Sequence, residues 1–409
     1  MGSHAGSFEK AYEPENKVLT FAEPPFHDKQ DLGIQKEISI GQAELRGQVT
    51  SLGGLDAYAI EGFSLVRVLE LAAACARLCP LEIRVTAMHL LAQGKCSEHT
   101  CRPPDCRCIG TDIPGSLPVN ETPQMVMLTF DDSVNVANYD YFTQLFDGKF
   151  RNPNGCPIRG TFFVSGDATQ YHFVEKLHKQ GQEIASHSVT HRSPTTYWAH
   201  AGYDGYVEEI EGMRKKLAEA SNIPRESIRG MRVPFLQVGG DDQYQMLEDF
   251  GFTYDTSMVT GHLYKDSNPP IWPFTLDYPP DSKTCSLTPC PTKSYPGLWE
   301  VPLIRWYGTN RLACAMPDGC TIGGGRVGTL QFLQDNFRRH YDTNRAPFGI
   351  FLHASWFRRK EGNLEGLMDF LQEMSQMKDV WVISVSQVID WMRSPETNSR
   401  AGKLDSWTC

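Results

Sequence analysis

The sequence predicts an α/β fold built on a parallel sheet, and three observations support this class. From Val119 onward, short apolar runs alternate with amphipathic stretches, which is the strand-then-helix order of such folds. The length of 409 residues accommodates one large domain of this kind, which often takes ~250 residues. Hydrophobic residues make up 40% and charged residues 22%, an ordinary globular composition that excludes a collagen, a coiled coil or a wholly disordered chain.

The individual elements follow from the spacing of apolar residues. Strands are predicted at Met125–Phe130, Ile158–Val164, Glu183–Ser186, Ile228–Val233, Trp299–Trp306, Gly349–Leu352 and Val380–Val385. Helices are predicted at Ala168–Lys179, Val207–Ala220, Asp242–Phe250, Gly328–Tyr341 and Leu364–Gln376. Residues 256–298 contain eight prolines and are predicted to form a long surface loop. The sheet is either open or closed into a barrel.

The charge pattern argues against two classes of partner. Thirty-nine basic and forty-nine acidic residues give a net charge of −10, and no basic run is long enough to follow a phosphate backbone. The most apolar region, Phe63–Leu91, is interrupted by five charged residues, so it falls short of the ~20 apolar residues of a membrane-spanning helix. We therefore expect no nucleic-acid partner and no membrane insertion. Separately, we expect a monomer.

Twelve cysteines indicate loops closed by disulfide bonds, and hence an extracellular compartment. A zinc knuckle is the competing interpretation of the first cluster, which however lacks a second matched ligand pair. The sequon at Asn120 agrees with secretion and glycosylation. The predicted pairs are Cys285–Cys290, Cys314–Cys320, Cys156–Cys409 and two pairs within Cys96, Cys101, Cys106 and Cys108; Cys75 and Cys79 are left without an interpretation.

Four regions are predicted along the chain. Residues 1–92 have no interpretable pattern, and we expect them to be partly disordered or to reflect a misassigned translation start. No secretory leader is recognisable there, because the apolar tract near Leu71 is too short and lies too far inside the chain. Residues 93–118 form a cysteine-rich lead-in, residues 119–395 the catalytic domain and residues 396–409 a C-terminal tail.

Two motifs of ligand-type residues follow predicted strands. Asp131 and Asp132 end the first strand, where active sites of parallel sheets lie, although an isolated Asp-Asp pair more often caps a turn. His187 and His191 are four residues apart, which places both rings on one face of a helical turn within reach of one cation. Two histidines and a carboxylate leave a coordination position open, as in catalytic rather than structural metal sites.

Two further polar residues end predicted strands. Arg232 precedes Val233-Pro234 and could fix a carboxylate through its guanidinium, or be an ordinary arginine at the sheet edge. His353 ends the strand Gly349–Leu352, where a lone histidine is more often a structural hydrogen-bonding group. Their common position at strand ends favours a shared site.

Together, these motifs resemble the polysaccharide deacetylase family, carbohydrate esterase family four, over residues 119–395. The motifs are Thr129-Phe-Asp131-Asp132, His187-x3-His191, Arg232-x-Pro-Phe235 and Leu352-His353. The chain most resembles single-domain insect chitin deacetylases, although Ala354 stands where bacterial relatives carry Asp. The resemblance implies a distorted (β/α) barrel with long disulfide-stapled loops. It also implies hydrolysis of the N-acetyl groups of chitin or chitooligosaccharides, and a secreted protein of the gut-associated chitin matrix.

The resemblance also implies a metal site. It makes Asp132, His187 and His191 the ligands of zinc or another divalent transition metal. The same resemblance makes Asp131 the general base.

The remaining roles in the reaction are implied in the same way. The resemblance makes Arg232 the residue that orients the base and His353 the general acid beside Leu352. The main-chain N–H of Phe235 would bind the oxyanion. The family also supplies an acid and a tryptophan, for which Glu300 and Trp306 are the available candidates.

Substrate binding is predicted from aromatic side chains, since sugar rings stack on them. The candidates are Trp198, Trp272, Trp306 and Trp356, although packing inside the protein is the alternative for each.

Three other functions remain open. A glycosidase would need carboxyls ~5–9.5 Å apart and has no use for two histidines. An acetyl-ester hydrolase would keep every motif, and an inactive chitin-binding protein would have lost at least one.

Overall fold

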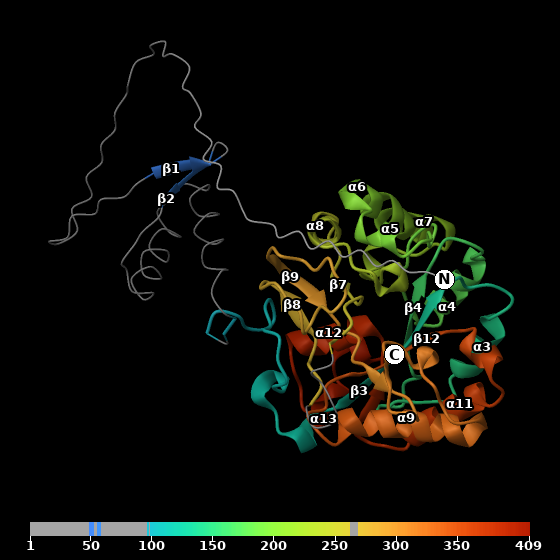
Figure 1. Ribbon diagram of the computed structural model, residues 1–409. Coiled ribbons are helices and arrows are strands. Elements are labelled where there is room, and N and C mark those ends of the chain that lie inside the picture. Colours follow the sequence, from blue (N-terminus) through green and yellow to red (C-terminus); the bar gives the residue numbers. More distant parts are fainter. Residues whose placement is uncertain (1–48, 53–54, 59–95, 98, 262–268) are drawn as a thin grey trace, which may run out of the picture. The chain divides into compact units, whose positions relative to one another are not determined.

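The computed structural model describes residues 49–52, 55–58, 96–97, 99–261 and 269–409 (Figure 1). The chain divides into two compact units, Met1–Val68 and Leu69–Cys409. In the first, β1 (Val49–Leu52) pairs antiparallel with β2 (Leu55–Tyr58). The expectations for the rest of residues 1–92, and for Cys75 and Cys79, lie outside the described residues. The predicted boundaries at residues 92, 118 and 395 stay predictions.

The second unit is built on one mixed but mainly parallel sheet. Its strands pair in the order β12-β3-β4-β5-β6-β7-β9-β8, and β13 also pairs with β3. The strands are β3 (Gln124–Asp132), β4 (Gly160–Val164), β5 (Glu183–Ser186), β6 (Gly230–Met231), β7 (Tyr254–Asp255), β8 (Phe274–Leu276), β9 (Tyr295–Glu300), β12 (Phe348–His353) and β13 (Val380–Val382). The predicted α/β class is therefore confirmed. Closure into a barrel stays a prediction, because the strand pairs among the described residues end at β8.

Helices follow most of the strands, as the sequence pattern predicts. They are α3 (Tyr139–Leu145), α4 (Tyr171–Lys179), α5 (Thr196–Ala199), α6 (Gly202–Tyr206), the π-helical turn η3 (Val207–Glu211), α7 (Gly212–Ala220), α8 (Asp241–Asp249), α9 (Gly325–Tyr341), α10 (Trp356–Arg359), α11 (Asn363–Met374), α12 (Val385–Arg393) and α13 (Asn398–Ala401). Helices α9 and α11 pack side by side (Figure 1). Among the residues that the structure describes, no helix is long and apolar enough to span a membrane.

Short elements complete the second unit. A two-stranded hairpin consists of β10 (Trp306–Tyr307) and β11 (Ala313–Cys314). The 3₁₀ turns are η1 (Pro114–Ser116), η2 (Val119–Glu121), η4 (Arg225–Ser227), η5 (Pro234–Leu236), η6 (Pro317–Gly319) and η7 (Asp405–Trp407). The predicted tail after residue 395 packs against the domain, because Trp407 is buried and its indole N–H donates to the carbonyl of Gln387 at 3.1 Å.

The central strand β3 is buried on both faces, as parallel strands between two layers usually are. Val126, Leu128 and Phe130 contribute to one apolar cluster, and Met125 and Met127 contribute to a second. This two-residue alternation places successive side chains on opposite faces of the sheet. The sheet therefore has an apolar core on each side.

Three sequence predictions about local structure are wrong. His187 and His191 do not lie on a helical turn, because the segment between them is an irregular loop in which Ser188 has φ +76° and His191 has φ +47°. The strand predicted at Trp299–Trp306 is divided between β9 and β10, because Pro302 lies in the intervening segment and has no N–H to donate to a sheet. The segment 256–298 is not wholly a surface loop. It contains β8, whose Phe274 and Leu276 are buried, and most of β9.

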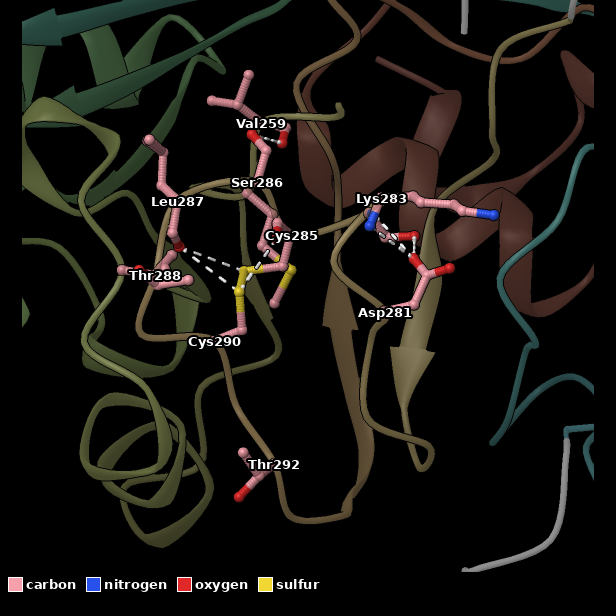
Figure 2. The surroundings of a disulfide bond; sticks show 12 residues. Val259, Asp281, Lys283, Cys285, Ser286, Leu287, Thr288, Cys290 and Thr292 are labelled. Carbon is pink, nitrogen blue, oxygen red and sulfur yellow. Dashed lines mark hydrogen bonds between the residues drawn. A yellow bond between two sulfur atoms is a disulfide. The ribbon is translucent and has the colours of Figure 1, made fainter. Parts of the chain in front are cut away.

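The described part of the chain contains five disulfide bonds, and they confirm the predicted pairs. They are Cys96–Cys108, Cys101–Cys106, Cys156–Cys409, Cys285–Cys290 and Cys314–Cys320. The zinc-knuckle alternative is excluded in this structure, because oxidised sulfurs are not thiolate ligands. Figure 2 shows the loop of Cys285–Cys290, where the Ser286 hydroxyl donates to the carbonyl of Val259 at 2.7 Å.

Candidate active site

Two adjacent carboxyl groups at the end of β3 have different surroundings. Asp131 is 6% exposed, whereas the side chain of Asp132 is 43% exposed. The backbone of Asp132 has φ +81°, in the left-handed region that residues other than glycine seldom adopt. One carboxylate is therefore enclosed by protein, and its neighbour is open to solvent.

Asp132 lies next to both histidines of the predicted metal site. Its Oδ1 is 3.8 Å from His187 Nε2 and 3.4 Å from His191 Nε2, and the three ligand atoms all lie within 4.8 Å of one another. Tetrahedral ligands ~2.1 Å from a zinc ion would be ~3.4 Å apart, so this spacing suits one such cation. The residues present thus fit a divalent metal.

The surroundings of His187 favour the neutral form of its ring, which is the form that binds a metal. Its Nδ1 lies 2.7 Å from the carbonyl oxygen of Arg232, so the N–H belongs on Nδ1 and the lone pair on Nε2 is directed to the cluster. Burial lowers the pKa of His187, although the charges of Asp131 and Asp132 oppose this effect. A lowered pKa keeps the ring uncharged, as metal binding requires.

Asp131 forms a buried ion pair with Arg232. The distance from Arg232 Nη1 to Asp131 Oδ1 is 2.7 Å, and Arg232 is fully buried. Arg232 Nε also donates to the carbonyl of Thr256 at 2.8 Å, and its guanidinium lies 4.2 Å from the ring centre of Phe163. Burial alone would raise the pKa of Asp131, but Arg232, together with His187 and His353, lowers it below the usual value. The carboxyl group of Asp131 is therefore ionised at neutral pH.

His353 enters the site from β12, where it is the parallel partner of Asp131 in the sheet. Its Nε2 lies 3.9 Å from Asp132 Oδ2, and its Nδ1 lies 2.6 Å from Asp318 Oδ2. Burial alone would lower the pKa of His353. The hydrogen bond to Asp318 and the nearby carboxylates outweigh burial and raise this pKa to about 9. His353 is consequently charged at neutral pH and carries a proton on Nε2.

Asp318 was missed in the sequence analysis, which offered Glu300 as the site's remaining acid. Asp318 belongs to η6, inside the loop closed by Cys314–Cys320, and its carboxylate also accepts the main-chain N–H of His353 at 2.9 Å. Glu300 is fully buried at the end of β9, where it accepts the N–H of Met258 at 3.0 Å. The acid that contacts His353 is therefore Asp318 and not Glu300.

The structure does not place the predicted substrate aromatics at an open surface. Each of the four indoles is at most 3% exposed and so has no free face for a sugar ring: Trp198, Trp272, Trp306 and Trp356. Trp272 stacks on Trp391 with ring centres 5.7 Å apart, and the Trp306 N–H donates to the carbonyl of Gly349 at 3.0 Å. Leu352 is also fully buried, in the apolar core. Because the four tryptophans and Leu352 are all buried, they contribute to the packing of the protein interior.

Phe235, by contrast, is exposed beside the cluster. The residue is 43% exposed, and its ring centre lies 4.7 Å from that of His191. Its backbone φ of +60° follows Pro234 in η5, so the chain turns sharply where it passes the histidines. Phe235 was predicted only for its main-chain N–H, and the exposure of the ring adds an apolar surface at the site.

Together, these features define a class of protein. At the carboxyl ends of its strands, a mainly parallel sheet carries a cluster of two histidines and one carboxylate, together with a second, buried carboxylate and a charged histidine. Such a combination of groups is typical of the active site of a metal-dependent hydrolase.

Comparison with known proteins identifies the family. Residues 119–254 match the family model described as polysaccharide deacetylase. Chitin deacetylase 8 of Bombyx mori is 38% identical over 78% of this chain and 84% of its own length. Chitin deacetylase 1 of Bombyx mori is 38% identical over 76% of this chain and 59% of its own length. The chain belongs to the polysaccharide deacetylase family, a family of metal-dependent hydrolases.

Several solved structures are similar over much of the chain. The family 4 carbohydrate esterase from Streptomyces lividans, in complex with acetate, matches 64% of this chain and 92% of its own, with a TM-score of 0.36 and 14% sequence identity. That likeness is too weak to add to the assignment.

Proposed function

We propose that the protein hydrolyses the N-acetyl groups of chitin or chitooligosaccharides, releasing acetate and leaving glucosamine units. The observation that carries this proposal is the ionised Asp131 beside the cluster of Asp132, His187 and His191. The substrate class comes from the two silkworm chitin deacetylases. None of the expected catalytic residues is replaced, which favours an active enzyme over an inactive chitin-binding protein.

The proposed metal is zinc, held by Asp132, His187 and His191. Two imidazoles and one carboxylate suit this ion, although other divalent transition metals accept the same ligands. When bound, the cation supplies a Lewis acid that polarises the acetamide carbonyl and makes water more acidic. The side chain of Asp132 is 43% exposed, so the proposed site is accessible from solvent.

Asp131 is the proposed general base. It removes a proton from the water whose oxygen attacks the carbonyl carbon of the acetamide. Arg232 holds the carboxylate in place and ionised by the 2.7 Å ion pair. The main-chain N–H of Phe235 is the proposed donor to the oxyanion that forms as the carbonyl adds water.

His353 is the proposed general acid. Breaking the C–N bond expels an amine, which leaves readily only after it receives a proton. The contact of Asp318 with Nδ1 keeps the Nε2 proton available, because it raises the pKa of His353. The products are acetate and a free glucosamine amino group.

The proposed setting is extracellular, with a monomeric enzyme acting on the chitin matrix. Five disulfide bonds within the described residues support an oxidising compartment. Chitin is uncharged, so the net charge of −10 would contribute little to substrate binding. An apolar contact with Phe235 is a more suitable source of affinity for a sugar ring.

Acetate release from glycol chitin tests the function. The intact protein is assayed as purified, after removal of metal by a chelator, and after addition of zinc to the chelated protein. We expect release that is lost with the chelator and regained with zinc. Release that is insensitive to the chelator would contradict the metal site. Release from acetylated xylan but not from glycol chitin would instead identify an acetyl-ester hydrolase.

A further inference from the structure

The loop that carries the two histidines is held by a glutamate outside the site described above. Glu209 lies in η3, a π-helical turn, and is 5% exposed. Its carboxylate accepts the main-chain N–H of Thr190 at 2.9 Å and the hydroxyl of Thr190 at 2.6 Å. Its carbonyl oxygen accepts the N–H of Val189 at 3.0 Å. Isolated π-helical turns are rare and occur frequently near functional sites.

This loop has an unfavourable backbone conformation. Ser188 has φ +76° and His191 has φ +47°, and neither is a glycine. Such residues cost of order 1 kcal/mol or more each and persist only where surrounding contacts impose them. Other contacts hold the two ends of the loop: the His187 N–H donates to the carbonyl of Val164 at 3.0 Å, and the Trp198 indole N–H donates to the carbonyl of Arg192 at 3.0 Å. Within the loop, Gly166 donates to the carbonyl of Ser188 at 3.0 Å, and the His191 N–H donates to the Ser188 hydroxyl at 2.9 Å.

Glu209 therefore supplies a large share of what fixes the loop. Of the three consecutive N–H groups of Val189, Thr190 and His191, the first two are bound by Glu209. The two histidines also differ in how their rings are held. His187 is oriented through its Nδ1 by the carbonyl of Arg232. The ring of His191, with 26% of its side chain exposed, has only the edge-to-face contact with Phe235 and the nearby carboxylate of Asp132, so its place depends more on the path of its backbone.

We propose that Glu209 is a positioning residue for the metal site, which sets the place of His191 by clamping the N–H of Thr190. This role rests on the proposed metal site and makes no use of Glu209 as a ligand or proton carrier. Groups that orient metal ligands from outside the coordination shell typically change metal affinity by about 10- to 100-fold when they are removed.

The test is zinc affinity, measured on the full metal-free protein by competition with a chromogenic chelator. Glu209→Ala is expected to weaken zinc binding about 10- to 100-fold. Thr190→Val removes only the hydroxyl contact and should weaken binding less. Glu208→Ala, on the same turn, is the matched control and should bind zinc as the wild type does. The unfolding temperature of each metal-free variant reports whether the fold is kept.

Two results would overturn the proposal. One is a folded Glu209→Ala protein whose zinc affinity lies within about twofold of wild type. The other, which decides the matter if Glu209→Ala does not fold, is an unchanged affinity in Thr190→Val. In the double variant, Thr190→Val should add no further loss to Glu209→Ala, because the two share one contact. A wild-type protein that binds no zinc would instead refute the proposed metal site itself.

Discussion

Asp131 and Asp132 are neighbours in the sequence, yet the protein gives them opposite surroundings. Asp131→Asn should keep the metal and lower kcat by about 10²- to 10⁴-fold, the usual contribution of a general base. Asp132→Asn removes a ligand and should lose the metal first. Elemental analysis and acetate release, measured on the same preparations, separate the two effects. Equal loss of metal in both variants would show that the roles are misassigned.

Asp318 should set the alkaline limit of activity. The general acid must be protonated, so activity declines as the pH rises through the pKa of His353, which is raised to about 9. Asp318→Asn removes the negative charge and the strong acceptor on Nδ1. We expect the pKa of His353 to fall and the alkaline limb of the kcat/KM profile to move to lower pH.

The pH profiles of wild type and Asp318→Asn on glycol chitin check this expectation. If the alkaline limb of the Asp318→Asn profile stayed at the wild-type pH, that limb would not reflect the ionisation of His353. Asp335→Asn, a change on the exposed side of α9, serves as the control and should leave the profile unchanged.

Among single residues, the sequence predicted the site residues that end or follow strands, and it missed Asp318, which does not follow a strand. Asp131, His187, Arg232 and His353 all end or follow a strand of the same sheet, and parallel strands bring such positions together. Asp318 lies in a short turn within an irregular loop, where no periodicity marks its direction. The tryptophans were misjudged for a related reason, because composition does not distinguish a ring in the core from a ring at the surface.

Among the elements, the contact between β6 and β7 is closely packed and offers a test of the sheet. A side chain added at Gly230 would place its Cβ 1.9 Å from the ring of Tyr254, which is fully buried. Gly230→Ala should therefore lower the free energy of unfolding by about 1–3 kcal/mol or more. Denaturation in urea measures the change.

Gly319→Ala is the matched control for this substitution, since no atom lies within 4 Å of the added Cβ. It should leave the midpoint of unfolding nearly unchanged. If both variants had the wild-type midpoint, the packing of Tyr254 against β6 would be wrong.

The long strands and helices were predictable because each carries its own signal. The apolar run of β3 and the amphipathic patterns of α9 and α11 exceed the length at which such signals become clear. Elements such as β7, with two residues, and β8, with three, contain too few positions to show a period. These short strands form because neighbouring strands supply hydrogen-bonding partners. Which strands become neighbours depends on the tertiary fold and cannot be read from a local stretch of sequence.

For the whole molecule, Cys156–Cys409 closes the largest covalent loop among the described disulfide bonds. Its sequence separation is 253 residues, whereas that of Cys285–Cys290 is 5. Replacing Cys156 and Cys409 by Ser should lower the free energy of unfolding by about 2–5 kcal/mol, because the unfolded chain regains conformational freedom. Urea denaturation of the oxidised protein measures this loss.

The double Ser variant at Cys285 and Cys290 provides the comparison. It releases a much shorter loop and should be less destabilised. A larger loss from the short loop would mean that native contacts, such as that of Ser286 with Val259, outweigh the entropy of the unfolded chain.

The sheet order also has a consequence for how the protein is made. β3, the first strand of the sheet to leave the ribosome, has its partners on one side in β12 and β13, the last two strands to be synthesised. Until β12 and β13 are made, the N–H and C=O groups along one side of β3 are unpaired. Such an apolar strand can pair with strands of other chains, which favours aggregation. Asp131 and His353, which are paired neighbours in the finished sheet, meet only at this final step. A nascent chain that has not yet reached β12 therefore has no working active site.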